Sequence, residues 1–252
     1  MEAIIAVAGK GGVGKTSISA MIVRQLIKKH PGKRILAIDA DPAIGLETSL
    51  GVSVSITVDD IRKEIVAAGE GESDKKRAIE LLGESRYRLL DAMVEKEGFA
   101  FLAIGRPEAS GCYCSVNSYL REIISAWSES FDYVVIDGEA GVEQINRRVM
   151  EKVTHLILVT DPCKRGMQVI QTIKRVAQDL TMYQKCGAII NRFNDEGLKK
   201  YLDLGGIDVL AYIPDDPALA LADVQGKTVM DIPEDSKLSI GVSEALRNLG
   251  IE

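Results

Sequence analysis

The chain has 252 residues, of which 46% are hydrophobic and 27% charged, so it is long enough to bury a sizeable core. A net charge of −6 and only 5% aromatic residues argue against a protein that neutralises nucleic-acid phosphates or stacks bases. No apolar run reaches the length of a membrane span, and Met1–Ala8 lacks the basic start of a signal peptide. The four cysteines are too few for a disulfide scaffold. We therefore expect a cytoplasmic protein that binds neither nucleic acid nor membranes.

Apolar, β-branched runs alternate with segments of helical periodicity along the chain. The runs predict strands at Ala3–Ala8, Arg34–Asp39, Phe99–Ile104, Tyr133–Asp137, His155–Thr160, Cys186–Asn191 and Asp208–Ile213. The segments between them predict helices at Ile18–Lys29, Val58–Ala68, Lys75–Glu95, Tyr119–Ser128, Gln144–Val153, Met167–Leu180 and Glu196–Leu202. Apolar strands separated by helices are typical of a mostly parallel sheet with helices on both faces. We expect one doubly wound α/β domain over residues 1–252.

The segment Gly9–Ser17 joins the first predicted strand to the first predicted helix. It contains the complete GxxxxGK[ST] pattern of a phosphate-binding P-loop, in the strand–turn–helix context that such a loop requires. Glycines permit positive φ, so that backbone N–H groups can surround phosphate oxygens at the helix N-terminus. The residues expected to bind nucleotide here are Gly11, Gly12, Val13, Gly14, Lys15, Thr16 and Ser17. Lys15 would reach the β- and γ-phosphates and Thr16 would ligate Mg²⁺, whereas the alternative is an ordinary glycine-rich turn.

Further polar clusters follow other predicted strands. They are Asp39–Pro42, Asp137–Gly141, Asn191–Asn194 and Pro214–Pro217. Ligands of open α/β sheets bind at the carboxyl ends of the strands, so we expect these clusters to converge on the P-loop. Simple turns are the alternative interpretation of the clusters that contain aspartate and proline.

The loop sequence KGGVGKTS, with its additional Lys10, resembles the deviant Walker A motif of the SIMIBI-class ATPases. That class includes MinD, ParA, the nitrogenase iron protein and metallocentre maturation ATPases. The resemblance implies a homodimer in which Lys10 reaches the partner's nucleotide, where a cation can stabilise the transferring phosphoryl group. It also implies that Asp41 positions the attacking water, that Asp39 lies near the Mg²⁺ shell and that Asp137 holds Mg²⁺ through water. Glu139 stands where the family usually has proline.

The same resemblance extends to the C-terminal third of the chain. Asn191-Arg192 matches the position whose amide reads the adenine edge, since an amide both donates and accepts hydrogen bonds. Pro214 and Asp216 match a second loop beside the adenine. The cluster that follows Asn191 lacks the aspartate of the NKxD motif, so ATP is expected rather than GTP. The implied catalytic residues are Lys10, Lys15 and Asp41, and the implied Mg²⁺ residues are Thr16, Asp39, Asp41 and Asp137.

A cysteine pair, Cys112 and Cys114, lies in a polar segment ahead of a predicted helix. The pair supplies two thiolates, whereas closed structural zinc sites generally have four ligands. A second copy of the pair across a two-fold axis is the simplest completion, and two unrelated buried cysteines are the alternative. Cys163 and Cys186 are interpreted as structural.

The CYCxxN pattern, completed by Asn117, resembles that of the CooC/AcsF-type nickel-insertion accessory ATPases. This resemblance implies ATP-dependent maturation of nickel carbon monoxide dehydrogenase or acetyl-CoA synthase, with one Ni²⁺ or Zn²⁺ bridging the homodimer. Thiolates do not by themselves distinguish the two metals. The alternative is a MinD/ParA-type positioning ATPase, although Leu238–Glu252 carries only Arg247 as a cation and fits an anionic membrane surface poorly. A nitrogenase-like reductase is disfavoured because the sequence Asp137–Val149 contains no cysteine.

Overall fold

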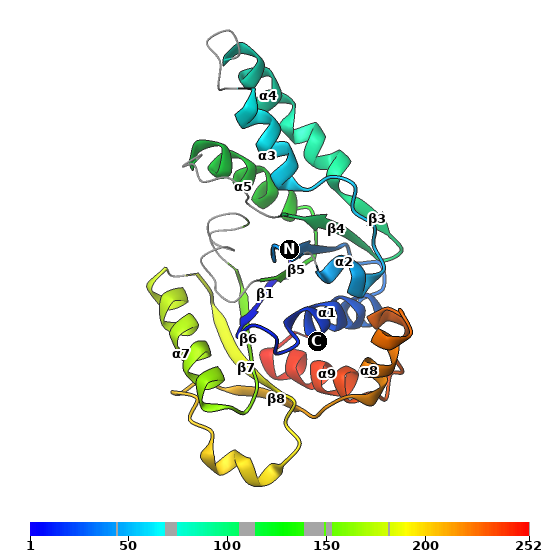
Figure 1. Ribbon diagram of the computed structural model, residues 1–252, viewed down its shortest axis with the longest axis vertical. Helices are drawn as coiled ribbons and strands as arrows, with labels where there is room; N and C mark the ends of the chain where they lie inside the picture. The colour runs from blue at the N-terminus through cyan, green and yellow to red at the C-terminus, as the bar shows by residue number, and fades with distance from the viewer. Residues whose placement is uncertain are drawn as a thin grey trace.

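The computed structural model describes residues 1–43, 45–68, 75–105, 114–138, 149, 153–180 and 182–251. Its centre is an eight-stranded sheet with the order β3-β4-β2-β5-β1-β6-β7-β8 (Figure 1). The strands are β1 (Ala3–Gly9), β2 (Ile35–Asp39), β3 (Val94–Lys96), β4 (Phe99–Ala103), β5 (Tyr133–Asp137), β6 (His155–Thr160), β7 (Lys185–Asn191) and β8 (Val209–Ile213). Every neighbouring pair is parallel except β3 with β4. The predicted doubly wound, mostly parallel α/β fold is therefore confirmed.

Helices cover both faces of the sheet (Figure 1). The described α-helices are α1 (Lys15–Lys29), α2 (Gly45–Leu50), α3 (Val58–Ala67), α4 (Lys75–Ala92), α5 (Cys114–Ser128), α7 (Lys164–Asp179), α8 (Pro217–Val224) and α9 (Lys237–Leu249), and the 3-10 helices are η1 (Glu196–Tyr201) and η2 (Val229–Asp231). Along β1, Ile5 and Val7 belong to the core cluster that contains residues of α1 and α9, whereas Ile4 and Ala6 belong to the cluster that contains residues of α3, α5 and α7. Successive strand residues point to opposite faces, so β1 contributes to both layers of the core.

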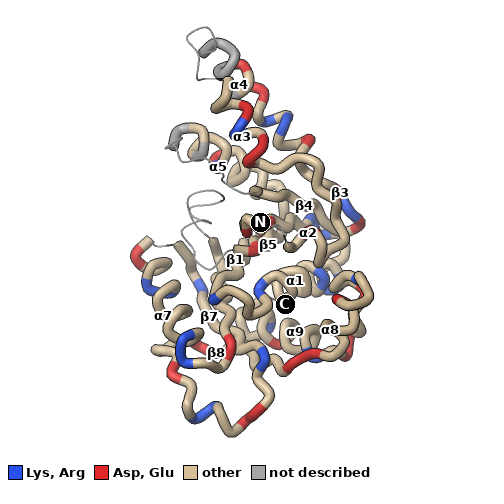
Figure 2. Tube along the Cα trace, in the orientation of Figure 1, with Lys and Arg blue, Asp and Glu red and all other residues tan. Residues whose placement is uncertain are grey.

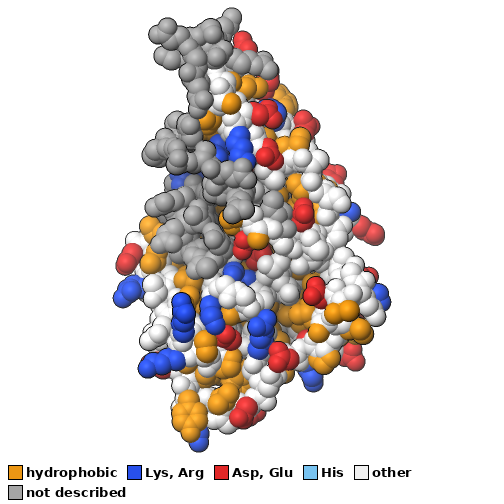
Figure 3. Space-filling view, viewed as in Figure 1, with side chains coloured by type: hydrophobic (Ala, Val, Ile, Leu, Met, Phe, Trp, Pro, Cys, Tyr) orange, Lys and Arg blue, Asp and Glu red, His pale blue; other side chains and the backbone are white. Residues whose placement is uncertain are grey.

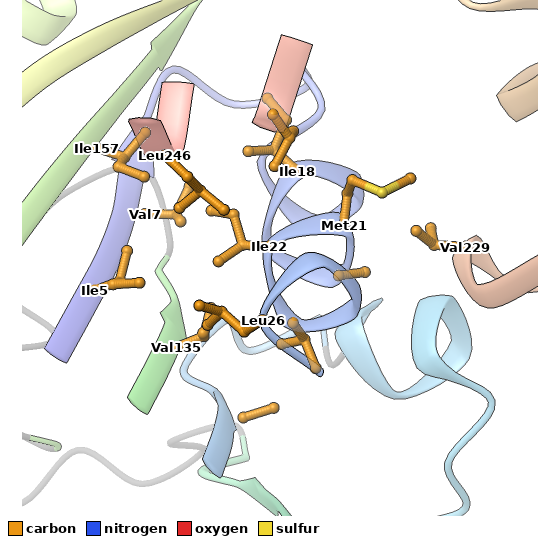
Figure 4. Packing of buried hydrophobic residues seen from close by; sticks show 14 of the residues in the cluster. Ile5, Val7, Ile18, Met21, Ile22, Leu26, Val135, Ile157, Val229 and Leu246 are labelled. Atoms are coloured by element: carbon orange, nitrogen blue, oxygen red, sulfur yellow. The ribbon is translucent and has the colours of Figure 1, made fainter. Parts of the chain in front are cut away.

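The helix α1 packs along the central strand through a stripe of buried residues. Ile18, Met21, Ile22 and Leu26 occupy positions i, i+3, i+4 and i+8 of a helical pattern and are fully buried. Figure 4 shows Ile22 and Leu26 directed towards the strand residues Ile5, Val7 and Val135, on the side where Leu246 of α9 lies, whereas Met21 is directed towards Val229. The packing fixes α1 against the sheet, which places its N-terminus at the carboxyl end of β1.

The edge of the sheet differs from the sequence prediction. A helix was expected over Lys75–Glu95, but α4 ends at Ala92 and Val94–Lys96 forms the edge strand β3. Gly98, with a φ of 87°, allows a tight turn into β4, so that β3 pairs with β4 in antiparallel register. Cross-strand pairing therefore outweighs the helical pattern at this end of the segment.

Two other predicted helices have different outcomes. The segment predicted as Glu196–Leu202 is the 3-10 helix η1, which has no buried residue and therefore lacks an apolar stripe to pack. The predicted helix Gln144–Val153 lies almost wholly outside the described residues. The structure also adds the short helices α2 and α8, which the sequence prediction lacked. Across the described ranges, no helix combines the length and apolar character needed to cross a membrane.

Candidate nucleotide site

The turn between β1 and α1, residues 10–14, has the backbone of an anion-binding loop. Gly12 has a φ of 75° and Gly14 a φ of 90°, conformations that residues with a Cβ rarely adopt. Gly14 is also the N-cap of α1 and provides no side-chain hydrogen bond to the helix. The first backbone N–H groups of α1 are thus without a side-chain cap, and the helix dipole favours an anion there. At Gly9, a Cβ would overlap the carbonyl oxygen of Val159 in β6.

A cavity of about 500 Å³ lies beside this loop. Its lining residues are Gly11, Gly12, Gly14, Lys15, Thr16, Asp41 and Arg192. Lys15 is only 7% exposed, and its Nζ donates to the carbonyl oxygen of Lys10 at 3.3 Å. This contact holds the ammonium against the turn, next to the uncapped helix N-terminus. The ammonium of Lys15 and the backbone N–H groups at the N-terminus of α1 lie around one cavity, an arrangement that suits a phosphate chain.

Two buried carboxylates meet at the ends of neighbouring strands. Asp39 of β2 and Asp137 of β5 are partners in the parallel register, and both are fully buried. Asp39 accepts hydrogen bonds from the backbone N–H groups of Asp41 and Leu46, at 3.1 and 2.9 Å. Asp137 Oδ1 accepts from the Ser19 hydroxyl at 2.8 Å, whereas its Oδ2 has no hydrogen-bond partner within the described residues.

The pKa values of both carboxyl groups are raised above that of an ordinary aspartate. Burial, reinforced by the charge of Asp137, raises the pKa of Asp39 to about 7. Burial also raises the pKa of Asp137 to about 6, although hydrogen bonds from Thr16 and Ser19 act in the opposite direction. A divalent cation would relieve both effects, and Oδ2 of Asp137, which has no hydrogen-bond partner among the described residues, offers it an oxygen. Mg²⁺ commonly uses one or two protein oxygens together with phosphates and water, so this donor set fits it.

Asp41 stands at the mouth of this region. Its Oδ1 accepts a hydrogen bond from the backbone N–H of Ala43 at 2.9 Å, which closes a turn after β2. The residue is half-buried and lines the cavity together with Lys15 and Thr16. The structure thus places Asp41 in the cavity beside the P-loop, Asp137 against Ser19 of α1, and Asp39 beside Asp137.

A second cavity, of about 550 Å³, adjoins the first. Gly14, Ser17, Asn191, Arg192, Pro214 and Asp216 are among its lining residues, so the segments predicted to flank the adenine meet here. The Asn191 side chain donates from Nδ2 to the carbonyl oxygen of Val13 at 2.7 Å and thereby ties β7 to the turn. Arg192 lines both cavities and has a φ of 56°, a left-handed conformation that is uncommon for a residue with a side chain.

The Asp216 side chain has a structural task. Its Oδ1 accepts from the N–H of Ala218 at 2.9 Å and caps α8. Its Oδ2 accepts from the N–H of Leu238 at 2.8 Å, at the start of α9. Both carboxylate oxygens of Asp216 therefore accept backbone hydrogen bonds at the starts of two helices.

The side chain of Lys10 points to β6 and α7. Its Nζ donates to Asp161 Oδ2 at 2.8 Å and to Cys163 Sγ at 3.4 Å. Cys163 is exposed and is the N-cap of α7, where its Sγ accepts from the N–H of Gly166 at 3.2 Å. Sequence reasoning missed both partners, although Asp161 directly follows the predicted strand His155–Thr160, just as Asp39 and Asp137 end predicted strands.

The predicted thiolate site is only partly within the structure. Cys112, Glu139 and Gly141 lie outside the described residues, and Cys114 is the first residue of α5, with no side chain described. Within the part of the chain that is described, no group of three or more His, Cys, Asp or Glu side chains is arranged to hold a metal ion. The CxC pair and its metal therefore stay predictions from the sequence.

Comparison with known proteins agrees with this fold. An uncharacterised ATP-binding protein of Methanocaldococcus jannaschii is 36% identical over 245 residues, which cover 96% of each chain. The carbon monoxide dehydrogenase accessory protein CooC of Rhodospirillum rubrum is 33% identical over 246 residues, covering 90% of this chain and 89% of CooC.

Solved structures show the same fold. MinD of Pyrococcus horikoshii, complexed with Mg-ADP, has a TM-score of 0.68 at 24% identity and covers 97% of this chain and 94% of its own. MinD of Aquifex aeolicus has a TM-score of 0.71 at 20% identity and covers 100% and 98%. Residues 4–229 match the CbiA family, the CobQ/CobB/MinD/ParA nucleotide binding domain. The chain therefore belongs to this family of nucleotide-binding domains.

Proposed function

We propose that this protein is an ATPase that closes as a homodimer on ATP and serves the maturation of a nickel enzyme, carbon monoxide dehydrogenase or acetyl-CoA synthase. The observation that carries the proposal is the 33% identity of this chain to CooC along nearly its whole length. The present sequence also contains the CxC pair, Cys112 and Cys114. The residues around the first cavity give the ATPase part of the proposal its physical basis.

Lys15 and the N-terminus of α1 bind the phosphate chain of ATP in this proposal, and Thr16 with Asp39 and Asp137 holds Mg²⁺. When bound, Mg²⁺ offsets the negative charge of the phosphate oxygens. Asp41, at the mouth of the same cavity, orients the attacking water towards the γ-phosphate. Hydrolysis then needs a further cation close to the transferring phosphoryl group, because charge spreads over its oxygens in the transition state.

Lys10 is the proposed source of that cation, acting across the dimer. The Nζ of Lys10 donates a hydrogen bond to Asp161, and Lys10 is not among the residues that line the phosphate cavity of its own subunit. A lysine that does not serve its own site is available to a second subunit brought up by closure. Lys15→Ala should abolish ATP hydrolysis, while Lys10→Ala should mainly weaken ATP-driven dimerisation.

Nickel is the proposed cargo, bound by the thiolates of Cys112 and Cys114 from both subunits. Four thiolates from two copies match the ligand number of a closed site. ATP binding and hydrolysis would alternate the dimer between closed and open states and so change the metal affinity or the contact with the client enzyme.

Equilibrium dialysis with Ni²⁺ and Zn²⁺ tests the metal part of the proposal. We expect one metal ion for every two wild-type chains and none in Cys112→Ala/Cys114→Ala. Cys186→Ala is the matched control, because this cysteine is half-buried in β7 and should leave the stoichiometry unchanged. Full stoichiometry in the double variant would contradict the assignment.

A positioning ATPase of the MinD/ParA type is the second candidate. MinD of Synechocystis is 26% identical over 251 residues, and α7 begins with the exposed residues Lys164 and Arg165. Figure 2 shows Lys and Arg at intervals along α7, and Figure 3 shows such side chains over the lower half of the same face. Sedimentation with anionic liposomes or with DNA in the presence of ATP separates the candidates. Strong binding that Lys164→Ala/Arg165→Ala removes would favour the positioning ATPase.

A further inference from the structure

Two hydrogen bonds join the loops that follow β7 and β8. Asn194 Nδ2 donates to Asp215 Oδ2 at 2.6 Å, and the backbone N–H of Asp215 donates to Asn194 Oδ1 at 2.9 Å. The amide of Asn194 thus donates to and accepts from one residue that lies 21 positions further along the chain. Because β7 and β8 are parallel neighbours, both loops reach the second cavity, whose lining includes Arg192 and Asp215 (Figure 1).

The residue that follows β7 has an unusual backbone conformation. Among the described residues other than glycine, Arg192 alone has a positive φ, which is 56°. A Cβ disfavours this conformation, which therefore persists only where neighbouring contacts impose it. On one side, the Asn191 amide donates to the Val13 carbonyl oxygen. On the other side, Phe193 is buried, and its N–H donates to the Ile213 carbonyl oxygen at 2.9 Å. The placement of Arg192 therefore depends on how the chain is held before and after it.

The loop that follows β8 is anchored independently of Asn194. Asp216 accepts backbone hydrogen bonds from Ala218 of α8 and from Leu238 of α9. The loop that follows β7 instead continues into η1, which has no buried residue. Asp215 is thus a fixed point beside the second cavity, and its two hydrogen bonds with Asn194 tie the less anchored loop to it.

We propose that Asn194 is a positioning residue for adenine recognition, which holds the loop after β7 against Asp215 and so keeps Arg192 in place at the second cavity. The inference rests on the proposed function, in which ATP is the ligand. Asn194 does not line either of the two cavities, so it acts through its neighbours and not on the nucleotide. The phosphate chain is bound by the P-loop, so loss of Asn194 should weaken only the contribution of the base.

Isothermal titration calorimetry with Mg²⁺ would compare ATP with pyrophosphate, which has no base. Asn194→Ala removes both exposed hydrogen bonds, so it should weaken ATP binding by about 3- to 10-fold and leave pyrophosphate binding unchanged. Asp195→Ala is the matched control, because it removes the adjacent exposed side chain and its bond to the N–H of Gly197. Both affinities should stay at the wild-type level in this control. Unchanged ATP affinity in Asn194→Ala, or an equal loss for both ligands, would overturn the proposal.

Exchanging the two side chains tests whether the pair itself is responsible. Asn194→Asp alone sets two carboxylates against each other and should weaken ATP binding more than Asn194→Ala does. Adding Asp215→Asn restores an amide opposite a carboxylate with the wild-type net charge, so ATP affinity should return to within about 2-fold of wild type. A double variant that binds ATP no better than Asn194→Asp would overturn the proposal. If the wild type binds neither ATP nor pyrophosphate, the proposed function fails, whereas wild-type ATP binding that is insensitive to Asn194 contradicts only the positioning role.

Discussion

The side chain of Asn191 has two candidate roles, which are to read the adenine and to support the phosphate-binding turn, and an experiment can separate them. The sequence predicts that its amide reads the adenine, whereas the structure has its Nδ2 donating to the carbonyl oxygen of Val13 at 2.7 Å. A Cβ at Gly14 would lie only 2.7 Å from the same nitrogen, so the amide is packed closely against the turn. We predict that Asn191→Ala loosens the phosphate-binding turn itself and weakens the binding of every ligand that needs it.

The expected loss of affinity follows from the hydrogen bond between Asn191 and Val13. Loss of one partly buried hydrogen bond, with its carbonyl acceptor left unpaired, costs about 1–2 kcal/mol, which corresponds to about 5- to 30-fold in affinity. Isothermal titration calorimetry with Mg²⁺ would compare ATP with pyrophosphate, which has no adenine. Both affinities should fall by the same factor in Asn191→Ala.

Asn248→Ala is the control for general loosening. Its amide makes the same kind of bond, from Nδ2 to the Leu210 carbonyl oxygen at 2.7 Å, but at the far end of β8. We expect it to lower stability without changing either affinity. If Asn191→Ala weakens ATP while pyrophosphate binds as to wild type, the amide reads the base and the reasoning from Val13 is wrong.

Two further predictions concern stability, measured by urea unfolding. Burial, with a smaller effect of the Lys185 charge, lowers the pKa of His155 from 6.5 to about 4. Between these values the unfolded chain binds the proton and the folded chain does not, so His155 by itself contributes a loss of about 1–2 kcal/mol from pH 7 to pH 5. The raised pKa values of Asp39 and Asp137 contribute a gain over the same range, so the His155 contribution is the difference between wild type and His155→Gln. An identical pH dependence in the variant would count against this prediction. Gly241→Ala should destabilise by about 1–3 kcal/mol, because its Cβ would lie 2.5 Å from Ile213 Cγ1, which outweighs the gain in helix propensity. Gly83→Ala, in α4 with no atom within 4 Å of its Cβ, should instead stabilise by about 0.5–1 kcal/mol, and a similar sign for both variants would refute the packing argument.

The local sequence pattern was sufficient to predict much of the fold. All seven predicted strands occur, because fully buried parallel strands need continuous apolar runs that few other elements share. The P-loop was equally readable, since Gly12 and Gly14 provide the positive φ that its turn requires. Periodicity failed at Val94–Lys96, where pairing with β4 decides the structure, and a pairing partner is invisible to a local pattern.

The site depends on contacts between distant parts of the chain. The sequence by itself determined which residues end the strands and therefore which carboxylates and amides could face a ligand. Only the strand order decided that Asp39 stands beside Asp137, and only the adjacency of β1 and β6 brought Lys10 to Asp161. Periodicity records which face of an element is apolar, but it carries no information on which strand will be its neighbour. Strand order arises from packing the whole sheet, so the partners of Lys10 could be found only in the tertiary structure.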